Sequence, residues 1–119
     1  MVNANIKEKI KLDDVLDVML EPLLESYKFT ANEYFEEDGS VVLNLVEISF
    51  LIETGKDREE AIKNMAAGIL DYAGDYCNDF NYWYSGTNTK LHLPYVLKAL
   101  ILNDIEKIGG LITCRPGEI

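Results

Sequence analysis

The chain has 119 residues, of which 48% are hydrophobic, enough to fill the core of one domain spanning residues 1–119. Acidic residues outnumber basic ones by 21 to 11, and the formal net charge is −10. Such a surface repels phosphate and attracts cations, so it argues against nucleic-acid binding by this chain alone and favours a small basic protein as partner. No apolar run has membrane-spanning length and the N-terminus lacks the apolar core of a signal peptide, so we expect a cytoplasmic protein that binds no membrane.

The first predicted element is an acidic amphipathic helix at residues 12–25. Asp14, Asp17 and Glu21 are among the carboxylates that would occupy its outer surface. Pro22 removes one backbone hydrogen bond inside this pattern, so we expect a kink or a break there. The apolar residues that recur at helical spacing are Leu12, Val15, Leu16, Met19, Leu20, Leu23 and Leu24.

Three strands are predicted next, at residues 27–35, 41–48 and 49–53. Asp38-Gly39 follows the first of them and is a strong hairpin signal, because both residues can adopt positive φ. Consecutive strands joined by short turns predict an antiparallel meander, and a helix should cover one of its faces.

A long helix is predicted from Asp57 to Tyr84, packed on the sheet and completing a core at residues 27–84. Asp57 is the expected N-cap, and Glu60 stands three residues later, as in a capping box. The side expected to face the core carries Ala61, Ile62, Met65, Ala66, Ile69, Ala73, Tyr76, Phe80 and Trp83.

The C-terminal part is predicted as a further helix and a short strand, together spanning residues 94–114. Pro94 suits the first turn of a helix, and Gly109-Gly110 should end it. The strand at 111–114 would leave a sheet edge that favours pairing with a second copy, so we expect a homodimer. The fold class is therefore α+β.

Asp71, Asp75 and Asp79 recur at intervals of four on the long helix with no Lys or Arg between them. Along a straight helix they would spread over more than roughly 10 Å, too far for one metal ion to touch all three. We therefore predict no metal here. Two interpretations stay open for this acidic stripe, a solvated surface and a docking site for a cationic partner.

The end of the same helix carries more aromatic rings than one face can bury. Helical spacing turns Tyr76, Phe80 and Trp83 inward, whereas an interface would use the remaining rings beside the carboxylates. The candidates for contact with a partner are Tyr72, Tyr82 and Tyr84.

No motif of an enzyme or of a cofactor site is present. His92 is the only histidine, and no GxSxG, HExxH or Cys-His pattern accompanies it, so a structural or surface role is expected. Cys77 and Cys114 lack CxxC spacing and are expected to be free, buried thiols. We predict no cofactor and no catalysis.

The stretch from Tyr27 to Phe80 combines the DG turn at Asp38-Gly39, a strand at Val41–Leu45 and a helix start within Thr54–Ala61. In these features it resembles HicB-type antitoxins, which have a partial ribonuclease-H-like β-β-β-α-β domain. The acidic N-terminal helix and the overall size look more like RelB-like antitoxins of type II toxin–antitoxin systems. The resemblance implies a protein that neutralises a small basic ribonuclease toxin by masking its RNA-binding surface.

Two functions outside this interpretation remain open. One is a stand-alone regulatory or structural homodimer. The other is a diverged ribonuclease-H-like hydrolase, which would need Glu33, Glu47 and Glu53 to converge around a divalent metal. The chain after Gly86 does not resemble a helix-turn-helix or ribbon-helix-helix module, which argues against operator binding on its own.

Overall fold

The computed structural model describes residues 18, 22 and 25–118. The predicted helix at 12–25 falls largely outside these residues, as do the candidate contacts Asp14, Asp17 and Glu21.

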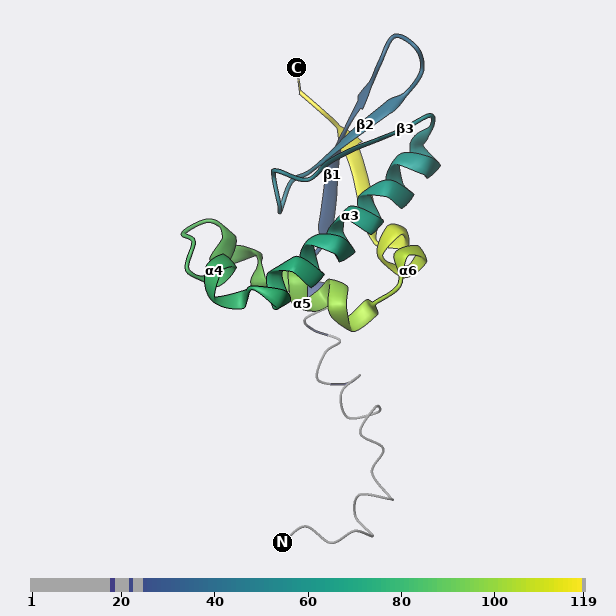
Figure 1. Cartoon of the computed structure of the whole chain (residues 1–119). Helices are drawn as coiled ribbons and strands as arrows, with labels where there is room; N and C mark the ends of the chain where they lie inside the picture. The colour runs from purple at the N-terminus through teal and green to yellow at the C-terminus, as the bar shows by residue number, and fades with distance from the viewer. Residues whose placement is uncertain (1–17, 19–21, 23–24, 119) are drawn as a thin grey trace, which may run out of the picture.

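A mixed four-stranded sheet forms the centre of the molecule (Figure 1). Its strands are β1 (Phe29–Phe35), β2 (Val41–Leu45), β3 (Ile52–Gly55) and β4 (Ile112–Pro116), in the order β3-β2-β1-β4. Neighbouring strands among the first three are antiparallel, whereas β4 runs parallel to β1. The α+β class is thus observed, and the sheet is mixed because the last strand adds to it in the parallel sense.

Buried and half-buried side chains alternate along β1 and β2, so one face of these two strands lies against the core. Phe29, Ala31 and Glu33 point to the buried side of β1, and the residues between them are half-buried. Gly39 has φ of 89°, the left-handed conformation that the DG turn was expected to need. Asp38 accepts hydrogen bonds from both the backbone N–H and the hydroxyl of Ser40, which lower the pKa of the Asp38 carboxyl.

The second strand ends earlier than predicted, and the third begins later. The predicted segments 41–48 and 49–53 are wrong in these bounds because residues 46–51 form a loop closed by side-chain hydrogen bonds. The Asn44 amide donates to the carbonyl oxygens of Ser49, at 2.7 Å, and Leu51, at 3.2 Å. The carboxylate of Glu47 accepts from the backbone N–H of Thr30 at 2.6 Å.

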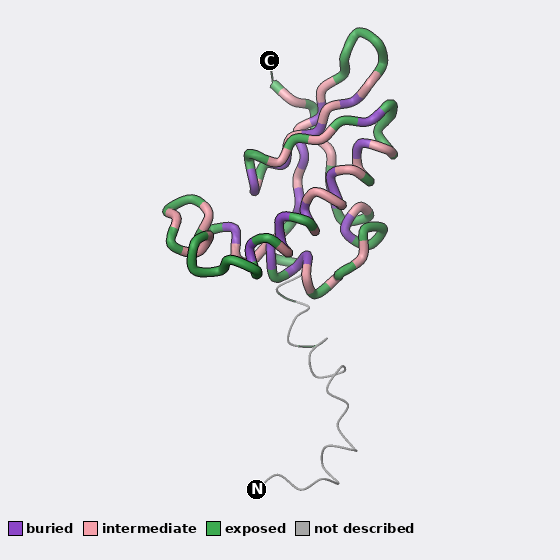
Figure 2. Tube along the Cα trace, viewed as in Figure 1, coloured by how far each residue is buried: buried purple, intermediate pink, exposed green. Residues whose placement is uncertain are grey.

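Helix α3 (Arg58–Asn78) lies across one face of the sheet and buries its inner side against it (Figures 1 and 2). The Asp57 side chain accepts from the N–H of Glu60 at 2.8 Å, so the predicted N-cap is observed. Much of the core lies between the sheet and this helix. It contains Phe29, Ala31, Val41, Leu43, Leu45, Ala61, Met65, Ala66, Ile69 and Ala73.

Both predicted helices after the sheet are interrupted. The first breaks at Asp79, and a short helix α4 (Phe80–Tyr84) follows it. The second, preceded by the 3-10 helix η1 (Thr89–His92), divides into α5 (Leu93–Leu102) and α6 (Ile105–Gly110). Asn103 ends α5 with φ of 44°, and the side chain of Asp104 caps α6 by accepting from the N–H of Lys107 at 2.9 Å. These side chains favour helix ends over helix interiors, which explains the breaks.

Candidate partner-binding surface

The C-terminal end of α3 concentrates negative charge. Asp71 and Asp75 are exposed on this helix, and Asp79, also exposed, ends it and joins it to α4. No basic residue occupies the last turn of α3. Because the helix dipole already places partial negative charge at this end, each carboxylate in the last turn is unfavourable by about 0.3–1 kcal/mol at low salt. The predicted stripe is therefore an anionic helix end that a cation would stabilise.

Tyr72 is buried, so the prediction that it faces a partner is wrong. Its hydroxyl lies 2.7 Å from Nδ1 of His92, and its exposed fraction is 5%. Burial raises the pKa of Tyr72 to about 12, so this phenol stays protonated and can donate to the imidazole. The ring of Phe50 covers the pair edge-on, at 4.9 Å from Tyr72 and 5.6 Å from His92. The expected structural role of His92 agrees with this arrangement.

Helix α4 turns back over the end of α3, which is what buries Tyr72. Trp83 meets the ring of Tyr72 edge-on at 5.3 Å and stacks on Tyr76 at 6.2 Å. The hydroxyl of Tyr76 donates to the carbonyl of Thr89 at 2.8 Å, tying α3 to η1. A sequence pattern that assumes one straight helix cannot show this reversal.

Two rings of helix α4 are left outward. Tyr82 is 66% exposed, as expected of a contact residue, and Phe80 is 42% exposed although helical spacing predicted it to be inward. Phe80 stacks on the half-buried Tyr84 at 5.0 Å, and the ammonium group of Lys90 lies 4.9 Å above the Tyr84 ring. The predicted contact residues Asp71, Asp75, Asp79, Tyr82 and Tyr84 therefore all lie on the end of α3 or on α4, and Phe80 is the residue that the pattern missed.

The two thiols occupy different environments. Cys77 is exposed on α3, so its predicted burial is wrong, because the helix turns this position away from the sheet. Cys114 is half-buried in β4, and burial raises the pKa of its thiol above the ordinary value. A raised pKa keeps the sulfur protonated and makes it a poor nucleophile.

The carboxylates required by the hydrolase alternative do not converge. Glu33 is buried and receives two hydrogen bonds from Arg58, at 2.5 and 2.7 Å. Leu43 stands between Glu33 and Glu53 in the strand register, and Glu47 lies in the loop after β2. Within residues 18, 22 and 25–118, no group of three or more His, Cys, Asp or Glu side chains could hold a metal ion.

Stability between pH 5 and 8 should depend on His92. Burial lowers the pKa of His92 below its ordinary value near 6.5. The unfolded chain therefore takes up a proton at a pH where the folded chain does not, and stability falls as pH drops below about 6.5. We expect urea unfolding at pH 7.5 and 5.5 to show this loss, and the His92→Gln variant to show a smaller difference. An equal pH dependence in both proteins would contradict the role assigned to this histidine.

Two comparisons with known proteins found a match. Residues 2–114 match the model of a Phd-like family described as "Antitoxin of toxin-antitoxin, RelE / RelB, TA system". The chain belongs to this antitoxin family. A crystal structure of an antitoxin part of a putative toxin/antitoxin system from Syntrophomonas wolfei subsp. wolfei is 32% identical, with a TM-score of 0.75. The match covers 84% of the present antitoxin and 71% of that chain.

No curated protein matches the antitoxin. Among its described residues, no helix is long and apolar enough to cross a membrane. The family assignment confirms the predicted resemblance to antitoxins and, with it, a toxin as the class of partner.

Proposed function

We propose that this antitoxin neutralises a small basic ribonuclease toxin by covering its cationic RNA-binding surface with acidic helical faces. The acidic end is defined by Asp71, Asp75 and Asp79, with Tyr82 and Tyr84 on the adjoining helix α4. One observation carries the proposal: Asp75 and Asp79 stand where the α3 dipole already disfavours a carboxylate, and the last turn of α3 has no basic residue to compensate. Local rules of helix stability are broken most often where a function requires it.

The physical mechanism is competition for the same cations. A ribonuclease binds RNA phosphates with Lys and Arg, and the carboxylates of the antitoxin would occupy those groups instead. Exposed aromatic rings beside the charges supply apolar contact area, and an arginine can stack on such a ring. Tyr82 is the ring on α4 with the largest exposed fraction, 66%, and is the expected anchor.

A second acidic face is proposed for residues 12–25, through Asp14, Asp17 and Glu21. We further propose that residues 27–84, with the C-terminal strand, form a HicB-like core, which the placement of β4 beside β1 supports. Pairing through the edge strand β4 would make the antitoxin a homodimer. Because the net charge is −10, we expect no direct binding of nucleic acid by this chain alone.

Salt dependence tests the electrostatic mechanism. When the tagged antitoxin is purified from its own operon, a small basic protein should accompany it at about 50 mM salt and dissociate as the concentration approaches 1 M, where the Debye length is about 3 Å. Mass spectrometry identifies the partner, and light scattering measures the stoichiometry. A homodimer without a partner at every salt concentration would contradict masking and favour a stand-alone regulatory protein.

A further inference from the structure

The two edge strands of the sheet, β3 and β4, differ in how their outward backbone groups are satisfied. Successive residues of a strand direct their N–H and C=O groups alternately to its two sides. The carbonyl of Leu51 accepts from the N–H of Leu45 in β2, so the backbone groups of Thr54, three residues later, point to the free side of β3. The side-chain amide of Asn64 on α3 donates to the carbonyl of Thr54 at 2.7 Å. Helix α3 therefore satisfies part of the β3 edge.

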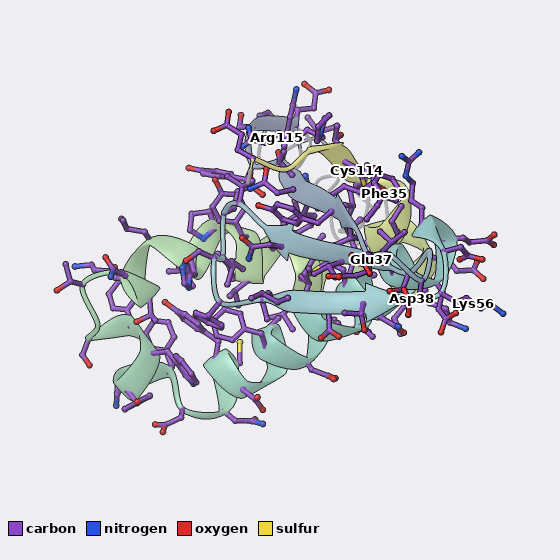
Figure 3. All side chains as sticks on the ribbon, turned by 90° about the horizontal axis from the view of Figure 1, so that it is seen from above. Phe35, Glu37, Asp38, Lys56, Cys114 and Arg115 are labelled. Atoms are coloured by element: carbon purple, nitrogen blue, oxygen red, sulfur yellow. The ribbon has the colours of Figure 1, made fainter. Side chains whose placement is uncertain are left out.

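The β4 edge lies at the opposite side of the sheet, where Figure 3 labels Cys114 and Arg115. The N–H of Gly117 donates to the carbonyl of Glu33 in β1 at 2.9 Å. By the same alternation, the backbone groups of Thr113 and Arg115 face β1 and those of Cys114 point to the free side. Within residues 25–118, β1 is the only strand that pairs with β4. The N–H and C=O of Cys114 are therefore positioned to pair with a further strand.

Charge limits which strand can pair there. Strand β4, ITCRP, contains no Asp or Glu although the net charge of the chain is −10, and its one charged residue is Arg115. The guanidinium group of Arg115 would repel a cationic toxin. Its Nε donates to Oδ1 of Asn32 in β1 at 2.7 Å, and this bond draws the side chain back over β1, away from the free edge. A second copy of β4 brings no carboxylates to the edge of an acidic protein, so it is the occupant that the charges favour.

We propose that β4 pairs in the antiparallel sense with β4 of a second copy, about a two-fold axis beside Cys114. Cys114 is the central residue of β4, so only this register pairs the whole strand with itself. The two Cys114 residues would exchange both backbone hydrogen bonds, and Thr113 would stand opposite Arg115 of the second copy. The inference rests on the homodimer proposed above and gives it a register. It does not depend on how the acidic end of α3 binds a toxin.

Hydrogen exchange resolved to single amides tests this pairing in the unaltered chain. At a concentration where light scattering finds a dimer, the N–H of Cys114 should be protected. Dilution to the monomer should accelerate its exchange at least about tenfold, because the bond that protects it belongs to the second copy. The amide of Arg115 is the internal control, since it faces β1 and should stay protected in both states.

A matched pair of variants tests the register. Thr113→Lys would place a positive charge opposite Arg115 of the second copy, and like charges directly opposite each other destabilise a strand pair. Because the two-fold axis repeats this contact, the dimer Kd should rise about tenfold. Thr54→Lys makes the same substitution at an exposed residue of the other edge strand and should leave the Kd unchanged. Analytical ultracentrifugation measures both constants.

Three outcomes would overturn the proposal. Fast exchange of the Cys114 amide at every concentration would show an unpaired edge, and protection that persists in the monomer would show that a segment of the same chain covers it. Equal Kd values for Thr113→Lys and Thr54→Lys would place the dimer interface elsewhere. Each of these results is distinct from a failure of the masking mechanism, which the salt dependence of toxin binding tests separately.

Discussion

Replacing Asp71 and Asp75 with lysine should weaken binding of the toxin by about 10- to 100-fold, which corresponds to about 1.4–2.8 kcal/mol. The two lysines would face the cations of the toxin and repel them. The same substitutions should leave the free antitoxin at least as stable as before, because Asp75→Lys places a positive charge in the last turn of α3, where the helix dipole favours it. Calorimetric titration with the co-purified toxin measures the first effect, and urea unfolding measures the second.

The control for this pair is Glu36→Lys/Glu37→Lys. These two carboxylates are exposed in the hairpin between β1 and β2, at the end of the sheet away from α4, where Figure 3 labels Glu37 and Asp38. Both double variants change the net charge by the same amount, so long-range attraction is reduced equally. A loss of affinity confined to the α3 variant supports a contact there. Equal losses would mean that net charge alone attracts the toxin.

The second large effect is expected from Gly55→Ala, which should destabilise the antitoxin by about 1–3 kcal/mol. Gly55 is the last residue of β3 and lies directly against the first turn of α3. A Cβ atom there would overlap the backbone nitrogen of Ala61 and come within 2.8 Å of its Cα. Backbone atoms cannot rotate out of the way as a flexible side chain can. The substitution should therefore separate β3 from α3, lowering the midpoint of urea unfolding.

Gly74→Ala is the matched comparison for that substitution. Gly74 lies within α3, and nothing stands within 4 Å of the position that its Cβ would occupy. Alanine favours a helix over glycine by about 0.5–1 kcal/mol, so this variant should be more stable than the wild type. If both variants changed stability in the same direction, close contact of Gly55 with the helix would not be the cause.

Local signals were sufficient to predict much of the sheet and the start of α3. Alternation fixed which side of β1 and β2 is buried, and the DG turn and the N-cap Asp57 lie where their chemistry requires. The loop at residues 46–51 escaped prediction because Ile48 is buried in it, with an exposed fraction of 1%. In the sequence, a buried isoleucine in a loop gives the same hydrophobic signal as a buried isoleucine in a strand.

Only part of the candidate site could be predicted, because the rest depends on contacts between elements that are separate in the sequence. Exposure of Asp71 and Asp75 follows from their position on α3. The burial of Tyr72 does not, because it depends on α4 and η1 folding back over the helix end. The Asn78-Asp79 pair at the break and Asn103-Asp104 after α5 were signals available in the sequence, since these side chains favour caps over helix interiors.

Because β1 pairs with β4, the ribosome makes β1 long before the strand that completes its pairing. Asn32 and Arg115, joined by a hydrogen bond of 2.7 Å, are 83 residues apart in the chain. At about 5–20 residues per second, a ribosome needs roughly 4–17 s to add the residues between them. During that interval β1 is an edge strand whose unpaired backbone groups are open to other chains. The newborn antitoxin therefore exposes this edge of its sheet until its last strand has been made.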